Sequence, residues 1–470
     1  MCSFLVTTKK VSKERLLEAN YYQKFRGPDA TNINEIEGVT YLHNLLSITG
    51  DFTLQPFSKD KVVAIYNGEI YNYLNLYPEA ISDGYSLIPS YENYGDTFLQ
   101  KLDGEFAIVL IDLKKQKIIF GIDTFGCKPL FYSLKEGYHF ASYKSALEIL
   151  GIEDIKQVEG NEWFIYDIKT KNLEAKTVSV FDVDREFKDS FEDWNIAFEE
   201  SIKKRAISHK PVMMGVSEGY DSGCISCALV ANNIDFKMYS VNVLDKPSNV
   251  LLWRHGLSSK TPPSINGIEI KVPDIKNKQF IDPNLIDHIK ICSHIYNKCE
   301  PYEYVYYDHN VNNTIKKVCR NTYGFLGAGL ILKTAREEGY RICLSGLAGD
   351  IIGCPQINKK IKDLKNLNYV VDYDDNNVYS CEYCCGVHGI EIRYPFLDTK
   401  LWQETLWLNK KICTQWKHPQ RQYMLKHHFP FVDTDENGIE IFEKVGFYKA
   451  MPATFETYRE KLCNSYKVLN

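Results

Sequence analysis

The sequence predicts two domains: a sheet-rich α+β domain, followed by an α/β domain built on a parallel sheet. Three observations support this prediction. The chain has 470 residues, more than the roughly 250–300 that one hydrophobic core usually serves. Short apolar runs separated by turn residues fill about the first 165 residues. Beyond residue 190, apolar runs alternate with helical patterns, which favours parallel strands joined by crossover helices.

Composition and charge exclude several classes of protein. Apolar residues make up 44% of the chain and charged residues 25%, which are ordinary globular values. The net charge of −5 is spread over both signs, so there is neither a basic stripe for nucleic acid nor a polybasic membrane anchor. No signal-peptide core and no apolar run near the roughly 18 residues of a membrane span occur. We therefore expect a cytoplasmic protein whose 14 cysteines are reduced thiols.

Cys2, directly after the initiator methionine, is a candidate nucleophile. If Met1 is removed, a thiol and a free α-amine share one residue. Their reference pKa values are about 8.5 and about 7.7–8.0, so near neutrality the amine can take the thiol proton. The alternative interpretation is a small buried apolar residue, as most cysteines are.

The first domain is expected to form short strands and few helices. Strands are predicted at residues 3–7, 62–66, 103–112 and 117–122, a helix at residues 13–22, and a turn at residues 26–29. The strand at residues 62–66 runs into Asn67-Gly68, a dipeptide typical of hairpin turns. The functional alternative is that the Asn67 amide and the Gly68 N–H face a developing oxyanion.

Five motifs occur in order in this first domain. They are Cys2, RGPD (26–29), YNGEIYN (66–72), DGEFA (103–107) and FGCKPL (125–130). Together they resemble the class II glutamine amidotransferase domain, an N-terminal-nucleophile (Ntn) hydrolase. The resemblance implies an αββα sandwich over residues 1–180, in which Cys2 attacks the side-chain amide of glutamine and releases ammonia.

The resemblance also assigns roles in the glutamine site. Asn67 and Gly68 match the family's oxyanion hole, and Glu69 and Asp83 match acidic positions that hold the glutamine ammonium. Where the family usually has an arginine for the substrate carboxylate, this chain has Leu45. A leucine cannot replace a charge-assisted pair, typically about 1.5–3 kcal/mol. Glutamine affinity therefore requires another cation.

A charged stretch at residues 168–188, poor in apolar residues, predicts the boundary before a second domain at residues 190–470. The run SFED (190–193) predicts a helix start, with Ser190 as N-cap and Asp193 closing a capping box. Further elements are expected as strands at 211–216, 236–244 and 341–344, and as helices ending at residue 231 and covering 330–338.

Two loops of this second domain follow predicted strands. SEGYDSG (217–223) lies between a strand and a helix, a layout that suits phosphate because unpaired N–H groups and the helix dipole favour anions. A plain βα turn is the alternative. The loop resembles the pyrophosphate-binding motif of ATP-pyrophosphatases, the adenine nucleotide α-hydrolase-like proteins. SGLAGDIIG (345–353) and GIEIRYPFLD (389–398) resemble a second nucleotide loop and a signature of asparagine synthetases, and only residues 246–318 have no match.

The resemblance implies that ATP activates a carboxylate, aspartate first, as an acyl-adenylate, and that ammonia then displaces AMP. Asp221 and Asp350 match magnesium-binding aspartates, and hard oxygen ligands suit that ion. Lys444 matches a lysine at the reacting phosphate, with a solvated lysine as the alternative. The residues expected around ATP are Val216, Ser217, Gly219, Asp221, Ser222, Ser345, Gly346 and Asp350.

Two departures from the family pattern leave alternatives open. Glu218 stands where the first loop usually has glycine, and Leu347 stands where the second usually has glutamate. We hypothesise that Glu218 replaces the lost carboxylate as a catalytic group. The alternatives are another acceptor, such as a sugar acid or a peptide, or a synthetase-derived binding or regulatory protein without turnover.

Partners and metals complete the expectations. The expected ligands are glutamine and the acceptor carboxylate, with no nucleic acid and no membrane, and a homodimer is the assembly considered. A separate cluster, Cys381, Cys384, Cys385 and His388, could supply zinc ligands. Cysteines at this spacing on a helix more often pack as small apolar residues, which is the interpretation favoured here.

Overall fold

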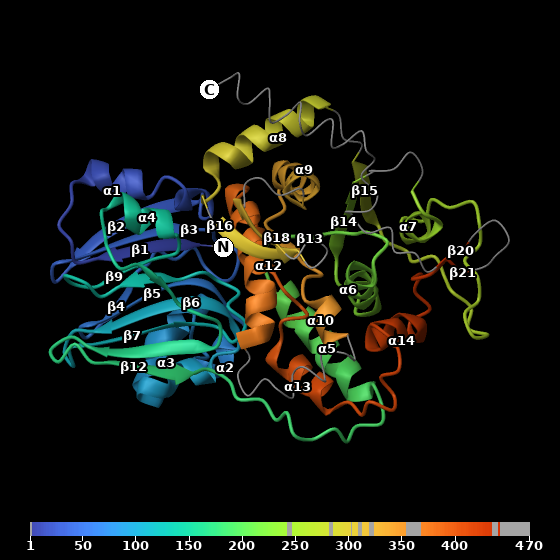
Figure 1. The fold of residues 1–470 in the computed structure, drawn as a ribbon, viewed down its shortest axis with the longest axis horizontal. Helices are drawn as coiled ribbons and strands as arrows, with labels where there is room; N and C mark the ends of the chain where they lie inside the picture. Colours follow the sequence, from blue (N-terminus) through green and yellow to red (C-terminus); the bar gives the residue numbers. More distant parts are fainter. Residues whose placement is uncertain are drawn as a thin grey trace.

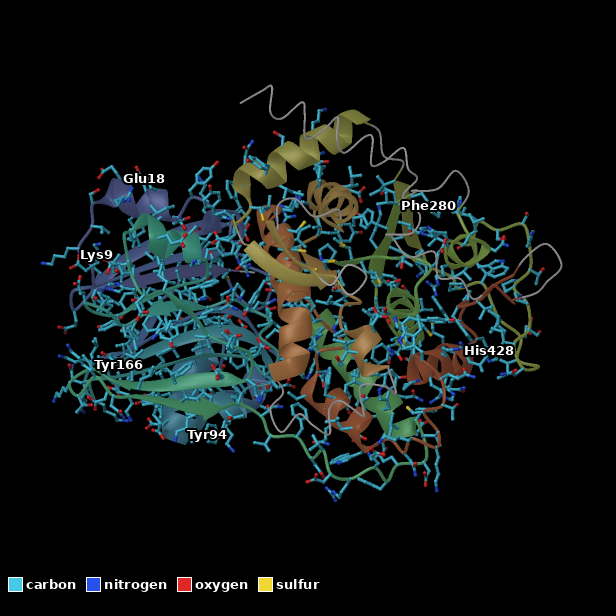
Figure 2. All side chains as sticks on the ribbon, viewed as in Figure 1. Lys9, Glu18, Tyr94, Tyr166, Phe280 and His428 are labelled. Atoms are coloured by element: carbon cyan, nitrogen blue, oxygen red, sulfur yellow. The ribbon has the colours of Figure 1, made fainter. Side chains whose placement is uncertain are left out.

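The computed structural model describes residues 2–241, 247–281, 285–301, 303–308, 313–318, 324–353, 368–434 and 440–441. An N-terminal part, drawn in blue to green, lies beside a C-terminal part, drawn in green to red (Figure 1). The labelled side chains of Lys9 and His428 mark the outer sides of these two parts (Figure 2).

Two antiparallel sheets form the N-terminal part. The first has the order β10-β8-β9-β1-β3-β2, and the second the order β12-β11-β7-β6-β5-β4. The strands of the first are β1 (Ser3–Thr7), β2 (Ala30–Ile36), β3 (Val39–Leu45), β8 (Phe131–Ser133), β9 (His139–Ala141) and β10 (Lys156–Gln157). Those of the second are β4 (Phe57–Lys59), β5 (Val62–Ile70), β6 (Gly104–Asp112), β7 (Lys117–Ile122), β11 (Glu162–Asp167) and β12 (Leu173–Thr177).

Helices cover the outer face of each sheet. Alternating side chains such as Phe4 and Val63 form the apolar layer between the sheets. Leu5, which points the other way along β1, packs under the helices of the first sheet. These helices are α1 (Lys13–Ala19) and α4 (Lys144–Ile149), whereas α2 (Tyr73–Leu76), η2 (Asp83–Ser86), α3 (Leu87–Tyr94) and η3 (Gly95–Lys101) pack on the second. The predicted αββα sandwich is confirmed.

Asn67 and Gly68 do not form the hairpin turn that their dipeptide suggested. They lie inside β5, where Asn67 pairs with Ala107 and Gly68 with Phe106 of β6. Gly68 has φ of +133°, and a Cβ there would lie 1.9 Å from the Glu105 carbonyl oxygen. The glycine is therefore required by the close approach of two strands, a contact that local sequence does not reveal.

A parallel sheet organises the C-terminal part. Its order is β15-β14-β13-β18-β19, and all four neighbouring pairs run parallel, which confirms the predicted α/β architecture. The strands are β13 (Val212–Gly215), β14 (Phe236–Val241), β15 (Asn277–Ile281), β18 (Ile342–Leu344) and β19 (Glu391–Arg393). Short antiparallel pairs are β16 (Glu303–Asp308) with β17 (Asn313–Val318), and β20 (Asp433–Thr434) with β21 (Glu440–Ile441).

Helices surround this sheet and begin at slightly different positions from those predicted. The first starts at Glu192, so its N-cap is Phe191 instead of Ser190, although Ser190 Oγ still accepts the Glu192 N–H at 3.0 Å. Asp193 forms an ion pair with Lys188 at 2.6 Å. The helices are α5 (Glu192–Ala206), α6 (Tyr220–Ala231), α7 (Asn249–Arg254), α8 (Leu285–Lys298), α9 (Gly324–Glu337), α10 (Gly349–Ile352), α12 (Asn368–Val387), α13 (Thr399–Trp407) and α14 (His418–Lys426).

Buried ion pairs join the two parts where α12 stands against the sandwich (Figure 1). Glu382 of α12 accepts from Arg26 Nη2 at 2.8 Å and from Lys128 Nζ at 2.7 Å, and all three side chains are fully buried. Arg205 of α5 donates to Glu105 of β6 at 2.7 Å and to Asp398 at 2.9 Å. The predicted domain boundary between residues 180 and 190 stays a prediction. The buried ion pairs connect residues before this boundary with residues after it.

The described residues bear on two expectations, reduced cysteines and the lack of a membrane-spanning helix. None of the cysteines with a described side chain forms a disulfide, as expected for reduced thiols. Within the described ranges, no helix combines the length and the apolar character that crossing a bilayer would demand.

Replacing Glu382 by glutamine should destabilise the protein by about 3–5 kcal/mol, because Arg26 would keep a buried charge without its carboxylate and Lys128 would keep only the longer ion pair with Glu105, at 3.6 Å. Urea-induced unfolding followed by tryptophan fluorescence would measure the change. Glu200→Gln is the matched control: Glu200 pairs with Lys400 at 2.6 Å, but both side chains are more than half exposed. The control should change stability by no more than about 0.5 kcal/mol. Equal effects of the two variants would contradict a structural role for the buried pair.

Candidate functional site

Cys2 lies in a pocket between the two sheets of the sandwich, at the beginning of β1. Three of the residues assigned to glutamine line the same pocket: Gly68, Glu69 and Asp83. Leu45, at the end of β3, also lines it, and no lysine or arginine is among the described residues of its wall. The remaining lining residues are Leu46, Ser47, Ile48, Thr49, Asp51, Thr53, Gln55, Phe57, Tyr66 and Ser82.

The Cys2 thiol is held between backbone groups of Leu46. The Leu46 N–H donates to Sγ at 3.4 Å, and Sγ lies 3.9 Å from the Leu46 carbonyl oxygen. Burial raises the pKa of Cys2 to about 11, while the positive chain terminus and the Leu46 N–H act in the opposite direction. The thiol therefore needs an adjacent base or positive charge to become a nucleophile at neutral pH.

The residues that flank Cys2 provide polar groups and rigidity. Arg26 Nε donates to the Cys2 carbonyl oxygen at 2.9 Å and fixes the backbone of the candidate nucleophile. Both polar atoms of the Asn67 side chain are buried without a hydrogen-bond partner among the described residues. A buried amide with unused hydrogen-bonding capacity is costly unless a ligand satisfies it. Asn67 thus has the capacity that an oxyanion hole requires.

Two acidic residues complete the pocket. Asp83 accepts from the Tyr66 hydroxyl at 2.6 Å and from the Ile70 N–H at 3.0 Å, and burial raises its pKa to about 6. Glu69 lies 3.1 Å from Nη2 of Arg393 on β19. Burial raises the pKa of Glu69, and the Arg393 guanidinium opposes that change. A cation from the C-terminal part thus contacts the acidic end of the pocket, a contact that the sequence did not predict.

Arg393 connects this pocket to the second candidate site. Its side chain contacts Glu69, and its backbone carbonyl accepts the N–H of Ser345 at 2.9 Å. Ser345 opens the second predicted nucleotide loop, directly after β18. The signature-like run at residues 389–398 thus lies between the Cys2 pocket and the predicted nucleotide loops, and Arg393 contacts both.

The two predicted nucleotide loops meet at a break in strand order. From β13 the chain proceeds to β14 and β15 on one side, and later to β18 and β19 on the other. The loops after β13 and β18 leave neighbouring strands at the same edge of the sheet. Ligands of open α/β sheets bind in the crevice at such a switch point, beyond the carboxyl ends of the strands.

The first loop is ordered by its own serines. Ser222 Oγ accepts the Ser217 N–H at 3.1 Å, and Ser217 Oγ accepts the Gly219 N–H at 3.1 Å. Val216 precedes the loop and is fixed to β14, since its N–H donates to the Tyr239 carbonyl at 2.7 Å. Gly219 is the N-cap of α6. These hydrogen bonds hold the loop in a fixed conformation directly before the N-terminus of α6, where an anion is favoured.

The second loop packs directly against the first. A Cβ on Gly346 would lie 3.0 Å from Asp221 Cβ, and one on Gly349 would lie 2.4 Å from Asp221 Oδ1. Ala348 takes a left-handed conformation with φ of 66° in the turn between them. Asp221 and Asp350, each in the first turn of its helix, are therefore brought together as predicted.

Arg254, which no sequence motif singled out, lies beneath the first loop. Its Nη1 donates to the carbonyls of Ser217 at 2.5 Å and Gly219 at 3.1 Å. A Cβ on Gly223 would lie 2.2 Å from its Nη2. Burial lowers the pKa of Arg254 to about 10, and the charge of Glu218 acts against this decrease. The guanidinium stays charged at neutral pH, and Glu218 partly balances it.

The aspartate pair does not offer a ready magnesium site. Lys417 Nζ lies 2.5 Å from a carboxylate oxygen of Asp221 and 2.5 Å from one of Asp350. An ammonium already neutralises the position that a cation bridging the two carboxylates would take. No group of three or more His, Cys, Asp or Glu side chains suited to a metal occurs among the described residues. The residues present therefore do not fit the predicted magnesium ion, and Lys444 falls outside the described residues.

The cysteine-rich run on α12 is part of the core. Cys384, Cys385 and His388 are buried, and Cys381 is partly buried. His388 stacks on His294 with ring centroids 5.0 Å apart. Because this run also lacks a metal-binding group in the described structure, packing explains it better than zinc.

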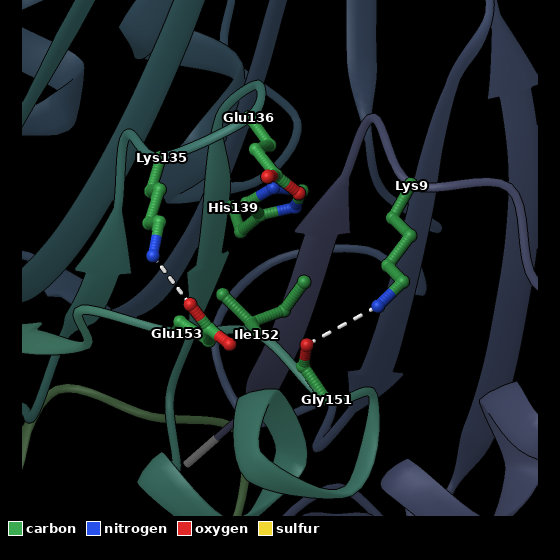
Figure 3. Close-up of a pocket in the computed structure, with 7 residues that line it drawn as sticks. All are labelled: Lys9, Lys135, Glu136, His139, Gly151, Ile152 and Glu153. Atoms are coloured by element: carbon green, nitrogen blue, oxygen red, sulfur yellow. Dashed lines mark hydrogen bonds and ion pairs between the residues drawn. The ribbon is translucent and has the colours of Figure 1, made fainter.

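A second pocket lies on the outer side of the first sheet (Figure 3). Both of its lysines already have partners: Lys9 donates to the carbonyls of Leu150 at 2.9 Å and Gly151 at 3.2 Å, and Lys135 pairs with Glu153. His139 shares a hydrogen bond of 2.7 Å with Thr7. These contacts tie loops of the sandwich together and explain the residues without a ligand.

Comparisons with known proteins agree with this arrangement. Residues 1–180 match the family described as glutamine amidotransferase domain. The chain is 26% identical over 458 residues to asparagine synthetase B (glutamine-hydrolyzing) of Escherichia coli K12, covering 88% of this chain and 76% of that protein. It is 25% identical over 430 residues, covering 82% and 72%, to "Putative asparagine synthetase (glutamine-hydrolyzing) 1" of Methanocaldococcus jannaschii. Residues 1–180 thus resemble a glutamine amidotransferase domain, and the chain as a whole is similar to glutamine-hydrolyzing asparagine synthetases over 82–88% of its length.

Proposed function

We propose that this protein is a ligase that consumes ATP and transfers the amide nitrogen of glutamine to a carboxylate. One observation carries the proposal: Arg393 contacts Glu69 of the Cys2 pocket with its side chain and Ser345 of a nucleotide loop with its backbone. A pocket suited to glutamine and loops suited to phosphate are thus parts of one packed structure. The similarity to glutamine-hydrolyzing asparagine synthetases supports the same combination of glutamine hydrolysis and amide synthesis.

In the first half-reaction, the thiolate of Cys2 attacks the side-chain carbonyl carbon of glutamine. The oxyanion is met by Asn67 and Gly68, ammonia leaves, and water then cleaves the thioester to give glutamate. Glu69 and Asp83 hold the ammonium of glutamine. Removal of Met1 supplies the α-amine that takes the thiol proton, which matters because burial holds the pKa of Cys2 high.

In the second half-reaction, a carboxylate oxygen attacks the α-phosphate of ATP and pyrophosphate leaves. Ammonia then attacks the acyl carbon, AMP departs, and the amide loses a proton. The N-terminus of α6 and the loop groups Ser217, Gly219, Ser222, Ser345 and Gly346 surround the phosphates. Arg254, beneath the first loop, adds a fixed positive charge.

Aspartate is the acceptor that the relatives' names favour. Another carboxylate is the alternative, because Leu347 stands where the family has a glutamate. A binding or regulatory protein without ligase turnover is the second candidate function. It is favoured by Leu45 in the glutamine pocket and by Lys417 between the two aspartates.

Cys2→Ala should reduce glutamine hydrolysis by roughly 10³-fold or more, because no other group forms the thioester. Amide formation with ammonium chloride in place of glutamine should continue. Glutamate release and amide formation, measured by chromatography, check both expectations. Cys127→Ala, which removes a buried thiol outside the pocket, is the control. Undiminished glutamate release by Cys2→Ala would exclude Cys2 as the nucleophile.

Aspartate should be required for the release of AMP and pyrophosphate when the protein is incubated with ATP, divalent salt and glutamine. The reason is that the adenylate forms on the acceptor. Omission of aspartate is the control, and asparagine is the expected product. Glutamate production without pyrophosphate release would indicate another acceptor or an inactive second site.

Glu218→Gln should lower amide formation about tenfold or more while leaving glutamine hydrolysis unchanged, if the Glu218 carboxylate replaces the one missing at Leu347. Coupled pyrophosphate and glutamate assays would separate the two activities. Glu200→Gln on α5 is the control, because the Glu200 side chain is more than half exposed and pairs with Lys400. Unchanged or faster amide formation by Glu218→Gln or Glu218→Gly would show that the carboxylate is not needed.

A further inference from the structure

Lys417 is a wholly buried cation at the meeting point of the two nucleotide loops. Its side chain has 0% exposure, and its Nζ lies 2.5 Å from carboxylates on both loops, Asp221 and Asp350. The Trp416 ring adds a cation–π contact, with 4.6 Å from Nζ to the ring centroid. None of the sequence motifs pointed to this lysine.

The backbone around Lys417 is fixed by hydrogen bonds that hold this residue beside the two aspartates. The residue takes a left-handed conformation with φ of 57°, uncommon for a residue with a Cβ, and its N–H donates to the Gly353 carbonyl at 2.6 Å. Gln420, one turn into α14, donates to the Gly349 carbonyl at 2.7 Å. A Cβ on Gly353 would lie 2.4 Å from the Gln420 amide. Residues 417–420 are therefore hydrogen-bonded to both ends of α10.

We propose that the Lys417 ammonium is the resident counter-cation of the two loops, in the place between Asp221 and Asp350 that a bridging divalent ion would take. A divalent ion bound to both carboxylates would have to displace the ammonium into a buried position without a partner, which is strongly unfavourable. The phosphates of a bound nucleotide would then meet Lys417 and Arg254. Only this last statement rests on the proposed function.

Binding of Mn²⁺, followed by electron paramagnetic resonance without nucleotide, tests the proposal on the full chain. The wild type and Lys417→Arg, which keeps the cation, should lack a site at the aspartate pair. Lys417→Met should bind Mn²⁺ roughly tenfold more tightly or better, because removing one partner of a buried ion pair leaves uncompensated charge. Adding Asp350→Asn to Lys417→Met should abolish that gain. Equal Mn²⁺ affinity of the wild type and Lys417→Met would overturn the proposal.

Thermal unfolding provides a second readout that turnover does not affect. Mg²⁺ should leave the Tm of the wild type unchanged and should raise that of Lys417→Met by about 2–4 °C or more, since a ligand that binds only the folded state stabilises it. A purely structural lysine would give a loss of Tm that Mg²⁺ does not restore.

If Lys417→Met does not fold, Asp350→Asn in the wild-type background still decides the question, because the Asp350 side chain is 58% exposed. It should leave Mn²⁺ affinity unchanged. Loss of an existing Mn²⁺ site in Asp350→Asn would show that the aspartates bind metal despite Lys417. None of these measurements uses glutamine or an acceptor, so they can fail or succeed independently of the proposed reaction.

Discussion

The arrangement of the molecule depends on charges buried between its two parts. Glu382, Arg26 and Lys128 are fully buried. Glu382 belongs to the C-terminal part and pairs with Arg26 and Lys128 of the N-terminal part. Arg205 and Glu105 make a similar pair a short distance away. A buried charge without its partner costs several kcal/mol. Such pairs add little net stability, yet they strongly disfavour any docking that separates them.

Residues at this boundary between the two parts also contact both candidate sites. Arg26 reaches from Glu382 to the carbonyl of Cys2, and Glu105, whose carbonyl fits against Gly68, also pairs with Arg205. Arg393 reaches from the second nucleotide loop to Glu69. Residues more than 300 positions later in the chain therefore help to position Cys2 and Glu69 in the Cys2 pocket. The pocket could not keep this geometry if the two parts separated.

Two buried side chains, Arg254 and Lys417, supply positive charge at the predicted nucleotide loops. Arg254 lies beneath the first loop, and Lys417 joins the aspartates of both loops. Glu218 stands near Arg254, so the added acid of the first loop has a cationic neighbour. The added acid of the first loop and the aspartates of both loops thus lie beside buried cations.

The sequence by itself determined the local features: several strands of the sandwich, the parallel sheet, the nucleophile candidate Cys2 and the two glycine-containing loops. These follow from apolar periodicity and from short motifs, which act over a few residues. Only the tertiary structure decided that Asn67-Gly68 lies inside a strand, that Arg393 approaches Glu69, and that Lys417 stands between Asp221 and Asp350. Each of these depends on segments distant in sequence that meet in space. Local sequence patterns carry no information about which buried charge will face which.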